Sequence, residues 1–177
     1  MRYLALFRGI NVGGKNSVKM QELRELFLEL GFKDVRSYIQ SGNIVFSSDS
    51  ELEKISEDVS AGFLERFGFS VPVIYRRAEE MSSLVQKLPF TKEEIAAAES
   101  TDPKVAHLYV YFSGSDMGKQ TLTDVGETVV IAAKDGYYLT EKSIRFSKLV
   151  SRLQRLSDDL TARNWRTIVK LAAMLEE

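Results

Sequence analysis

The sequence contains no cysteine, one histidine, one tryptophan and three prolines among its 177 residues. Without cysteine, the chain can form no disulfide, no thiol nucleophile and no cysteine-ligated zinc site. Because His107 is the single imidazole, histidine clusters that hold a metal or act as a paired acid and base are excluded as well. We therefore expect no metal site, and the sequence indicates no cofactor.

Long apolar runs are also missing. No run approaches the ~18 residues that suggest a membrane-spanning helix. The N-terminus lacks the basic region and apolar core of a secretory signal. The composition, 44% hydrophobic and 28% charged, is typical of a globular protein. These features predict a cytoplasmic protein that does not enter a membrane.

The small net charge of -1 conceals a segregation of charge along the chain. Residues 49–102 carry 12 acidic and 6 basic side chains, whereas residues 142–170 carry 8 basic side chains against Asp158 and Asp159. The first twenty residues contain four basic side chains and no acid. Both ends of the chain are therefore basic, and either could contact an anionic partner.

Hydrophobic patterning predicts a β-α-β-β-α-β order for the first 76 residues. The four expected strands are 3–7, 35–39, 43–46 and 71–75. The two middle strands flank Ser41-Gly42, a hairpin signal. This order is that of a ferredoxin-like α+β subdomain, in which the first strand lies at the centre of an antiparallel sheet beside the third and fourth strands.

Periodicity and end signals predict the two helices of this half. The first has apolar residues at helical spacing over residues 20–30 and stops at Gly31. The second starts from a capping box of Ser50 and Glu53 and ends at Gly68.

For the second half of the chain, the sequence pattern predicts the order β-α-β-β-α-α, which is an incomplete version of the order in the first half. Two helices, 81–88 and 91–99, precede it, and a Thr91/Glu94 capping box opens the second of them. The elements expected after them are a strand at 107–112, a helix near 117–122, strands at 128–133 and 137–140 joined at Asp135-Gly136, and helices at 146–156 and 161–175. The predicted parts are a ferredoxin-like subdomain (1–76), a helical connection (77–105) and a second α+β subdomain (106–177).

The loop after the first strand has an unusual composition. Arg8–Asn16, with the sequence RGINVGGKN, contains three glycines, two asparagines and two cations, more than a turn requires. In a split βαβ sheet, this loop and the hairpin after the second strand leave from the same end. The hairpin adds neutral polar groups, because residues 37–48 contain no charged side chain.

Together these loops predict a pocket for a small anionic or polar ligand at a helix N-terminus, where free N–H groups favour negative charge. The candidate contacts are Arg8, Asn11, Gly13, Gly14, Lys15, Asn16, Gln40, Ser41 and Asn43. The alternative is that the glycines serve tight turns and the asparagines hydrogen-bond the local backbone.

The same loop matches most of a phosphate-binding motif, G-x-x-x-x-G-K-[ST], from Gly9 to Lys15. Asn16 stands where the magnesium-binding hydroxyl should be. The elements that follow form a hairpin instead of a parallel βαβ unit. We therefore do not favour nucleotide hydrolysis.

The basic C-terminal segment is a second candidate site. Arg145, Lys148, Arg152 and Arg155 would share one stripe of a helix, which could hold phosphates or form an ordinary solvated face. Further along, Arg163 and Asn164 are added to the candidate ligand contacts. The adjoining tryptophan shares a helical face with apolar residues, which predicts a place in the core.

Acid and base groups are few. His107 begins a strand with tyrosines on its face, so a packed or surface histidine is a better interpretation than a general base. Neither of the two predicted ligand-binding loops contains a carboxylate. The sequence therefore identifies no catalytic residue.

Several segments resemble one family of bacterial proteins. RGINVGGKN, MQELRELFLELGF and VRSYIQSGNIVFSS are closely similar to the opening of domain of unknown function 1697. The resemblance continues at DPKVAHLYVYF, at Ser147–Leu149 and at TARNW. It implies a two-part α+β fold with ferredoxin-like halves and no established activity. This chain departs from the family pattern at residues 17–19 and at Arg145-Phe146, where a Gly-Arg pair is common.

Three functional classes follow from these observations. The favoured one is a protein that binds a small anionic or polar ligand at the two loops. A nucleic-acid-binding protein that uses the basic ends is the second, although Asn43–Phe46 lacks the glycine and aromatic pattern of an RNA-recognition strand. The third is a metal-free enzyme whose reaction the sequence does not indicate.

Overall fold

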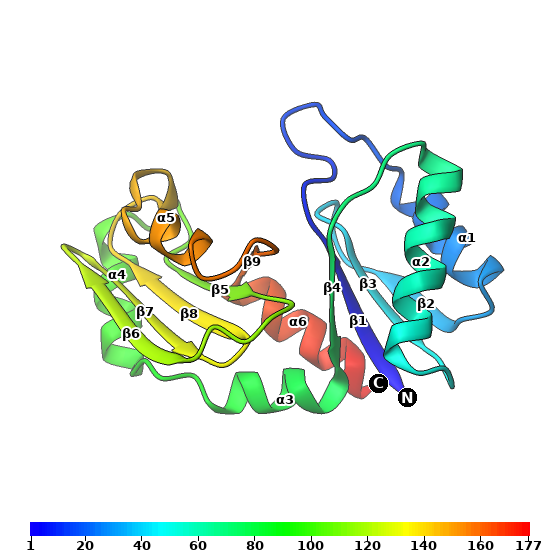
Figure 1. The fold of residues 1–177 in the computed structure, drawn as a ribbon. Helices are drawn as coiled ribbons and strands as arrows, with labels where there is room; N and C mark the ends of the chain where they lie inside the picture. The colour runs from blue at the N-terminus through cyan, green and yellow to red at the C-terminus, as the bar shows by residue number, and fades with distance from the viewer. The chain divides into compact units, whose positions relative to one another are not determined.

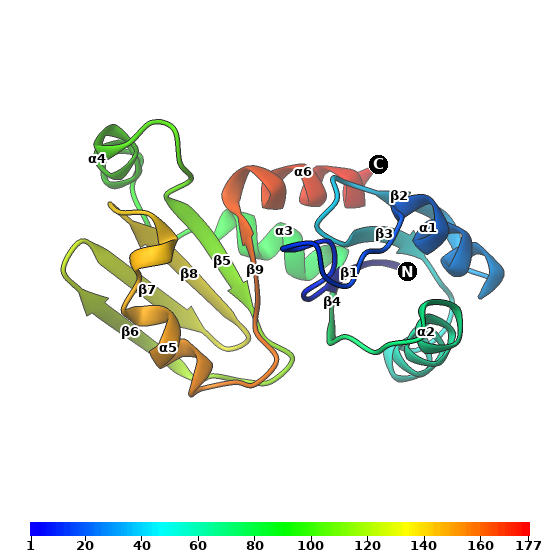
Figure 2. The same cartoon turned by 90° about the horizontal axis from the view of Figure 1, so that it is seen from above.

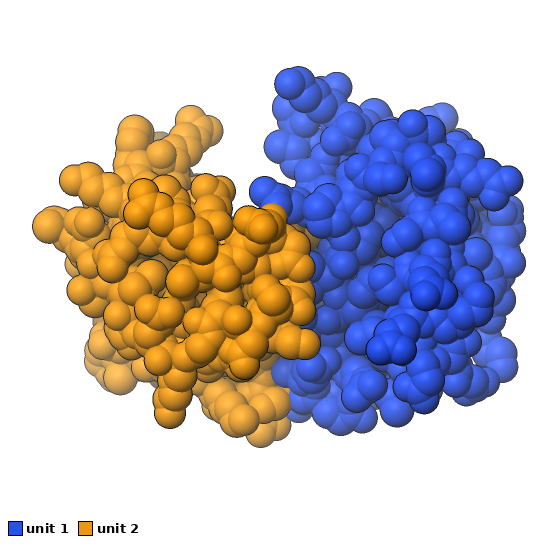
Figure 3. Space-filling view, in the orientation of Figure 1, with its two compact units in different colours: residues 1–82, 171–177 blue, residues 83–170 orange.

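The computed structural model describes all residues from 1 to 177 and contains two antiparallel sheets and six α-helices (Figure 1). The predicted α+β class is confirmed. The chain divides into two compact units, coloured separately in Figure 3: unit 1 comprises residues 1–82 and 171–177, and unit 2 comprises residues 83–170. None of the helices combines the length and the apolar composition needed to cross a membrane.

Unit 1 follows the predicted element order. Its elements are β1 (Arg2–Phe7), α1 (Met20–Glu29), β2 (Lys33–Ser37), β3 (Asn43–Ser47), α2 (Leu52–Phe67), β4 (Val73–Arg77) and the start of α3 (Ala78–Gln86). The sheet order is β2-β3-β1-β4, and β1 pairs antiparallel with both β3 and β4. The prediction that the first strand lies at the centre, between these two neighbours, is therefore confirmed.

The core of unit 1 forms on one face of this sheet. Successive strand residues point to opposite faces, so Tyr3, Ala5 and Phe7 of β1 share the face that α1 and α2 cover (Figures 1 and 2). Phe27 of α1 packs edge-to-face on Phe46 of β3 with ring centroids 5.0 Å apart. Burial of these rings fixes which face of the sheet the two helices cover.

The predicted N-terminal cap of α2 is wrong. The predicted Ser50/Glu53 capping box does not form, because α2 begins at Leu52 with Glu51 as N-cap and no side-chain cap. Ser50 instead belongs to the preceding turn, where its N–H donates to Ser48 Oγ at 3.1 Å. The C-terminal segment also joins unit 1, since Arg2 Nη1 donates to Leu175 O at 3.1 Å.

Unit 2 is built around a second sheet. Its elements are α4 (Lys92–Thr101), β5 (Leu108–Phe112), β6 (Lys119–Asp124), β7 (Glu127–Ala132), β8 (Asp135–Thr140), a 3₁₀ turn (Ile144–Phe146), α5 (Leu149–Gln154), β9 (Thr161–Asn164) and the first half of α6 (Trp165–Glu176). The strand order is β6-β7-β8-β5-β9. α4 and α5 lie on opposite sides of this sheet (Figure 2). The predicted Thr91/Glu94 capping box opens α4.

The structure corrects three predicted helices in this unit. Residues 117–122 do not form a helix, because residues 119–124 form edge strand β6 and pair with β7 along its length. The predicted helix 146–156 is a 3₁₀ turn followed by the short α5. In the predicted helix 161–175, the first four residues instead form β9, which pairs with β5, and the helix begins at Trp165. In the first and last cases, strand pairing outweighs a weak local helical pattern.

The predicted hairpin at Asp135-Gly136 exists, but its turn lies two residues earlier. Ala132 pairs with Asp135, so Ala133 and Lys134 form the turn, and Ala133 adopts φ +57°. Backbone hydrogen bonds hold this turn, because Ala133 N donates to Gly118 O at 2.8 Å. Gly136 instead lies within β8, where a Cβ would contact Val129 and Tyr111 at 3.5 and 3.8 Å.

Candidate functional site

The loop between β1 and α1, residues 8–19, forms a small hairpin that we call the finger. Lys15 N donates to Val12 O and Asn11 N donates to Asn16 O, both at 3.1 Å. In Figure 1 the finger is the dark-blue loop that extends beyond the ends of the strands. The prediction that this segment is more than a simple connection agrees with this geometry.

Two glycines form the tip of the finger. Gly13 has φ +60° and Gly14 has φ +72°. Two consecutive positive φ values are those of a type I′ turn, the usual two-residue connection of a hairpin. A Cβ at either position would have no neighbour within 4 Å. The tip is therefore exposed to solvent, and the glycines serve the turn.

Asn11 joins the finger to the hairpin between β2 and β3. Its Oδ1 accepts from Val18 N at 2.7 Å, and its Nδ2 donates to Val18 O and to Gln40 O, both at 2.9 Å. Nearby, Phe7 N donates to Gly42 O at 2.9 Å. The finger and the hairpin therefore lie against each other at one end of the sheet.

The other two predicted asparagines also hydrogen-bond the backbone. Asn43 is fully buried, and its Nδ2 donates to Tyr38 O at 3.0 Å and to Ser41 Oγ at 2.9 Å. Asn16 Nδ2 donates to Gly9 O at 3.1 Å. These carboxamides hold the two loops in shape, which is the role that the alternative interpretation of the sequence gave them.

Exposed groups at the same end are basic or neutral. Lys15 is exposed and takes part in none of the ion pairs of the structure, whereas Arg8 is half-buried at the end of β1. Gln40 is exposed on the hairpin. Because Glu22 is the first acid of the chain, no carboxylate of the finger offsets these cations.

The predicted helix N-terminus is not part of this arrangement. α1 begins at Met20, several residues beyond the finger tip, and its N-cap Lys19 has no side-chain cap. Lys15 lies in the finger's own β-bridge with Val12 and does not lead into a helix. A phosphate-binding loop passes directly into a helix, so the finger lacks the geometry of that motif.

The remaining predicted contacts, Arg163 and Asn164, belong to unit 2. Arg163 is buried, and its Nη1 donates to Thr161 Oγ1 and to Ala162 O, both at 2.8 Å. Burial lowers the pKa of its guanidinium to about 10. Asn164 caps α6, because its Oδ1 accepts from Thr167 N at 2.9 Å.

The basic stripe predicted on one C-terminal helix is divided among several segments. Arg145 lies in the 3₁₀ turn, Lys148 is the N-cap of α5, Arg152 lies within α5 and Arg155 is its C-cap. All four residues are exposed. The break between the two helical segments means that the predicted spacing along one continuous helix is not present.

A buried carboxylate explains that break. Glu127 Oε1 accepts from Leu149 N at 2.7 Å, from Lys148 N at 3.0 Å and from Ser147 Oγ at 3.2 Å. Its Oε2 accepts from Tyr138 OH at 3.2 Å. A carboxylate at a helix N-terminus satisfies N–H groups that otherwise lack partners, so α5 starts at the segment that Glu127 holds.

A cluster of hydroxyls around Asp159 is the other polar network of unit 2. Ser113 Oγ donates to Ser157 Oγ at 2.7 Å, and Ser157 Oγ donates in turn to Asp159 Oδ1. Burial alone would raise the pKa of Asp159. Hydrogen bonds from Ser157, from the Gly114 backbone, from its own backbone and from Ser113 outweigh burial and lower that pKa. Because these hydroxyls and the carboxylate hydrogen-bond one another and the Ser115 carbonyl, we assign the cluster a structural role.

We predict a pH-dependent contribution from this cluster. Because the folded-state pKa of Asp159 is lowered, its stabilising effect is complete above the unfolded-state value of about 3.9 and is lost as pH falls through the folded-state pKa. Asp159→Asn should therefore lower the urea midpoint at neutral pH, and the difference from wild type should shrink below about pH 4. Asp49→Asn, at an exposed carboxylate outside the cluster, is the control. A difference that stays constant into acid would contradict this assignment.

His107 is a packed residue, one of the two positions that the sequence left open. Its side chain is buried, and its ring nitrogens lie 2.7 Å from Thr140 O and 2.7 Å from Asp102 O. Both nitrogens are therefore occupied by the backbone. The imidazole is not available as a general base.

Sequence reasoning missed a cavity of about 540 Å³ in unit 2. Asn164 is the single predicted residue in its lining, which also includes Glu99, Trp165 and Arg166. Trp165 is half-buried there instead of fully packed in the core. The lining residues come from segments far apart in the chain, so no motif could have indicated them.

Comparisons with known proteins extend over most of the chain. The model of a family described as "Protein of unknown function (DUF1697)" matches residues 1–143. A solved structure of the conserved bacterial protein SP0830 from Streptococcus pneumoniae is similar, with 26% identity, a TM-score of 0.69 and 98% coverage of each chain. None of the curated proteins matches the sequence.

Proposed function

The chain belongs to the DUF1697 family of proteins of unknown function, and we propose that unit 1 binds a small anionic ligand between the finger and the β2–β3 hairpin. We also infer a ferredoxin-like fold for this unit from its element order and its β2-β3-β1-β4 sheet. In that fold, loops at one end of the sheet can converge without changing the core.

The observation that carries the proposal is the link made by Asn11. Its hydrogen bonds to Val18 and Gln40 hold the finger against the hairpin before any ligand is present. A loop that is already ordered loses less conformational entropy on binding than a mobile one. Asn16 and Asn43 act in the same way, as positioning residues that fix the shape of the two loops.

The accessible groups favour an anion. Lys15 supplies a positive charge, the Gly13-Gly14 turn supplies solvent-exposed backbone, and Gln40 supplies a neutral donor. Arg8 adds a planar guanidinium that suits a carboxylate or a phosphate. The small size of the finger and the lack of charge on the hairpin favour a ligand with one or two such groups over a long polyanion.

This site can be tested by titrating inorganic pyrophosphate and citrate while recording backbone amide NMR spectra. Shifts are expected at residues 9–16 and 40–42 for the better ligand, which also distinguishes phosphate from carboxylate recognition. Lys15→Gln should weaken its affinity about fivefold, since a partly exposed charge contact contributes roughly 1 kcal/mol. Lys33→Gln, an exposed cation at the start of β2, is the matched control and should leave the affinity unchanged.

Two outcomes would contradict the proposed site. Equal losses for Lys15→Gln and Lys33→Gln would indicate nonspecific attraction to positive charge. An oligonucleotide that binds more tightly than either small anion, with a steep dependence on salt, would favour the nucleic-acid alternative.

A further inference from the structure

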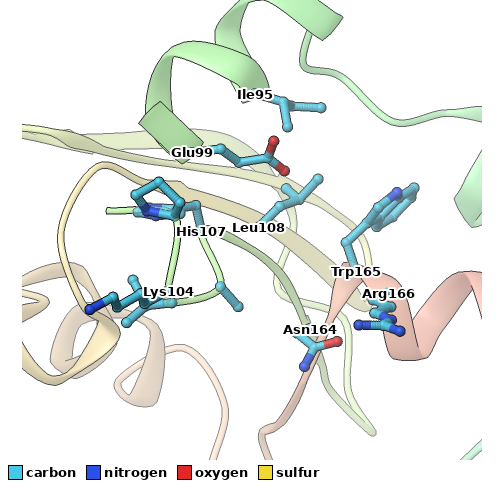
Figure 4. A pocket seen from close by; sticks show the side chains of 11 residues that line it. Ile95, Glu99, Lys104, His107, Leu108, Asn164, Trp165 and Arg166 are labelled. Carbon is cyan, nitrogen blue, oxygen red and sulfur yellow. The ribbon is translucent and has the colours of Figure 1, made fainter. Parts of the chain in front are cut away.

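The cavity of about 540 Å³ in unit 2 has the size of a small-molecule site. Its walls come from α4, from the segment 103–108 that leads into β5, and from the junction of β9 with α6. Ile95 and Leu108 supply apolar surface, and the Trp165 indole forms one side (Figure 4). The cavity therefore combines an aromatic wall with an aliphatic floor.

Charged groups of both signs line this cavity, namely Glu99, Lys104 and Arg166. Glu99 projects from α4 toward Leu108, and Arg166 lies below Trp165 beside the Asn164 amide (Figure 4). Neither Glu99 nor Arg166 takes part in an ion pair of the structure. Opposite charges that line one cavity without pairing leave both groups available to a ligand that carries the complementary pair.

A further donor is available beside Arg166 (Figure 4). The Asn164 Oδ1 caps α6, while its Nδ2 hydrogen-bonds no protein group. An anionic group placed here would meet the Arg166 guanidinium and the Asn164 carboxamide.

From this arrangement we propose that the cavity binds a small zwitterion with a flat apolar body, such as an aromatic α-amino acid. The apolar body would stack on Trp165, the carboxylate would bind Arg166 and Asn164, and the ammonium would face Glu99. An ammonium near both a carboxylate and an indole face gains from ion pairing and from the cation–π interaction.

Hydrogen bonds brace the backbone at the base of the cavity. His107 fixes the segment before β5 through its contacts with Asp102 O and Thr140 O, each at 2.7 Å. The capping bond from Thr167 N to Asn164 fixes the start of α6. Side chains that project from braced backbone keep their positions when a ligand enters.

Because Trp165 is the single tryptophan of the chain, its fluorescence reports on this cavity alone. We expect a saturable change when the whole protein is titrated with phenylalanine up to about 10 mM, a range suited to a small ligand. Phenylacetate lacks the ammonium and phenethylamine lacks the carboxylate. Each should bind about five- to tenfold more weakly than phenylalanine, because each loses one charge-assisted contact.

Two single-residue variants test which side chain binds the carboxylate of the ligand and which binds its ammonium group. Arg166→Gln should weaken phenylalanine and phenylacetate about five- to tenfold and leave phenethylamine unchanged. Glu99→Gln should weaken phenylalanine and phenethylamine by a similar factor and leave phenylacetate unchanged. The matched controls are Glu93→Gln on the same helix and Arg145→Gln, which remove exposed charges outside the cavity lining.

The proposal is overturned if none of the three probes gives a saturable change. It is also overturned if phenylacetate or phenethylamine binds as tightly as phenylalanine, or if the control variants weaken binding as much as the cavity variants. Calorimetry with Trp165→Phe, which keeps an aromatic wall, supplies a readout independent of fluorescence, and phenylalanine binding should persist there.

Discussion

Replacing Gly42 by alanine is expected to lower the free energy of unfolding by about 3 kcal/mol and to separate the hairpin from β1. Gly42 is buried with φ +82°, and a Cβ there would lie 2.8 Å from Phe7 Cβ and 2.8 Å from Ile10 Cδ1. The new methyl group therefore meets both a strained backbone conformation and the core. Urea unfolding measures the loss, and faster amide exchange at Phe7, which donates to Gly42 O, reports the local separation.

Gly68→Ala separates the two causes. Gly68 has nearly the same φ, +79°, but a Cβ there would have no neighbour within 4 Å. Its substitution should therefore cost only the conformational strain, roughly 1 kcal/mol. If both variants lose equal stability, the side chains of Phe7 and Ile10 do not exclude a Cβ at position 42.

Glu127→Ala is expected to destabilise unit 2 by about 3 kcal/mol, because hydrogen bonds to a buried charged group are strong and their donors would lose their acceptor. The variant removes an acceptor from Leu149 N, Lys148 N, Ser147 Oγ and Tyr138 OH together, and Leu149 N keeps its bond to Ser147 Oγ at 3.1 Å. Urea unfolding gives the total loss. Amide exchange at Leu149 and at the residues of α5 should show that this helix opens first.

The matched control is Glu65→Ala, which removes an exposed carboxylate and should change stability by under about 0.5 kcal/mol. Glu127→Gln retains the size of the side chain and one acceptor oxygen, so an intermediate loss is expected. A Glu127→Ala protein as stable as the control would show that solvent can replace the carboxylate at the start of α5.

Unit 1 was predictable because its signals are local. The apolar alternation of β1, the periodicity of α1 and the chain reversal at Gly42 each lie within a few residues. Given the β-α-β-β-α-β order, sheet geometry then places the finger and the hairpin at one end. The N-terminus of α2 was misplaced because the Ser50 N–H is engaged by Ser48 in the preceding turn.

Unit 2 was less predictable because distant residues decide its elements. β6 and β9 depend on pairing with β7 and β5, so their own sequences did not indicate strands. Gly136 suggested a turn, yet it lies within β8, where it pairs with Tyr111 of β5 and Ile131 of β7. The start of α5 is set by Glu127, twenty-two residues before Leu149.

The sequence by itself determined the α+β class, the sheet of unit 1 and the proximity of the two loops, because periodicity and turn chemistry act over short distances. Only the tertiary structure decided what the polar side chains do. In that structure the side chains of Asn11, Asn16 and Asn43 hydrogen-bond backbone carbonyl groups, whereas the side chain of Lys15 is exposed. The tertiary structure also brought Glu99, Trp165 and Arg166 to one cavity, since residues so far apart in the chain meet only through packing.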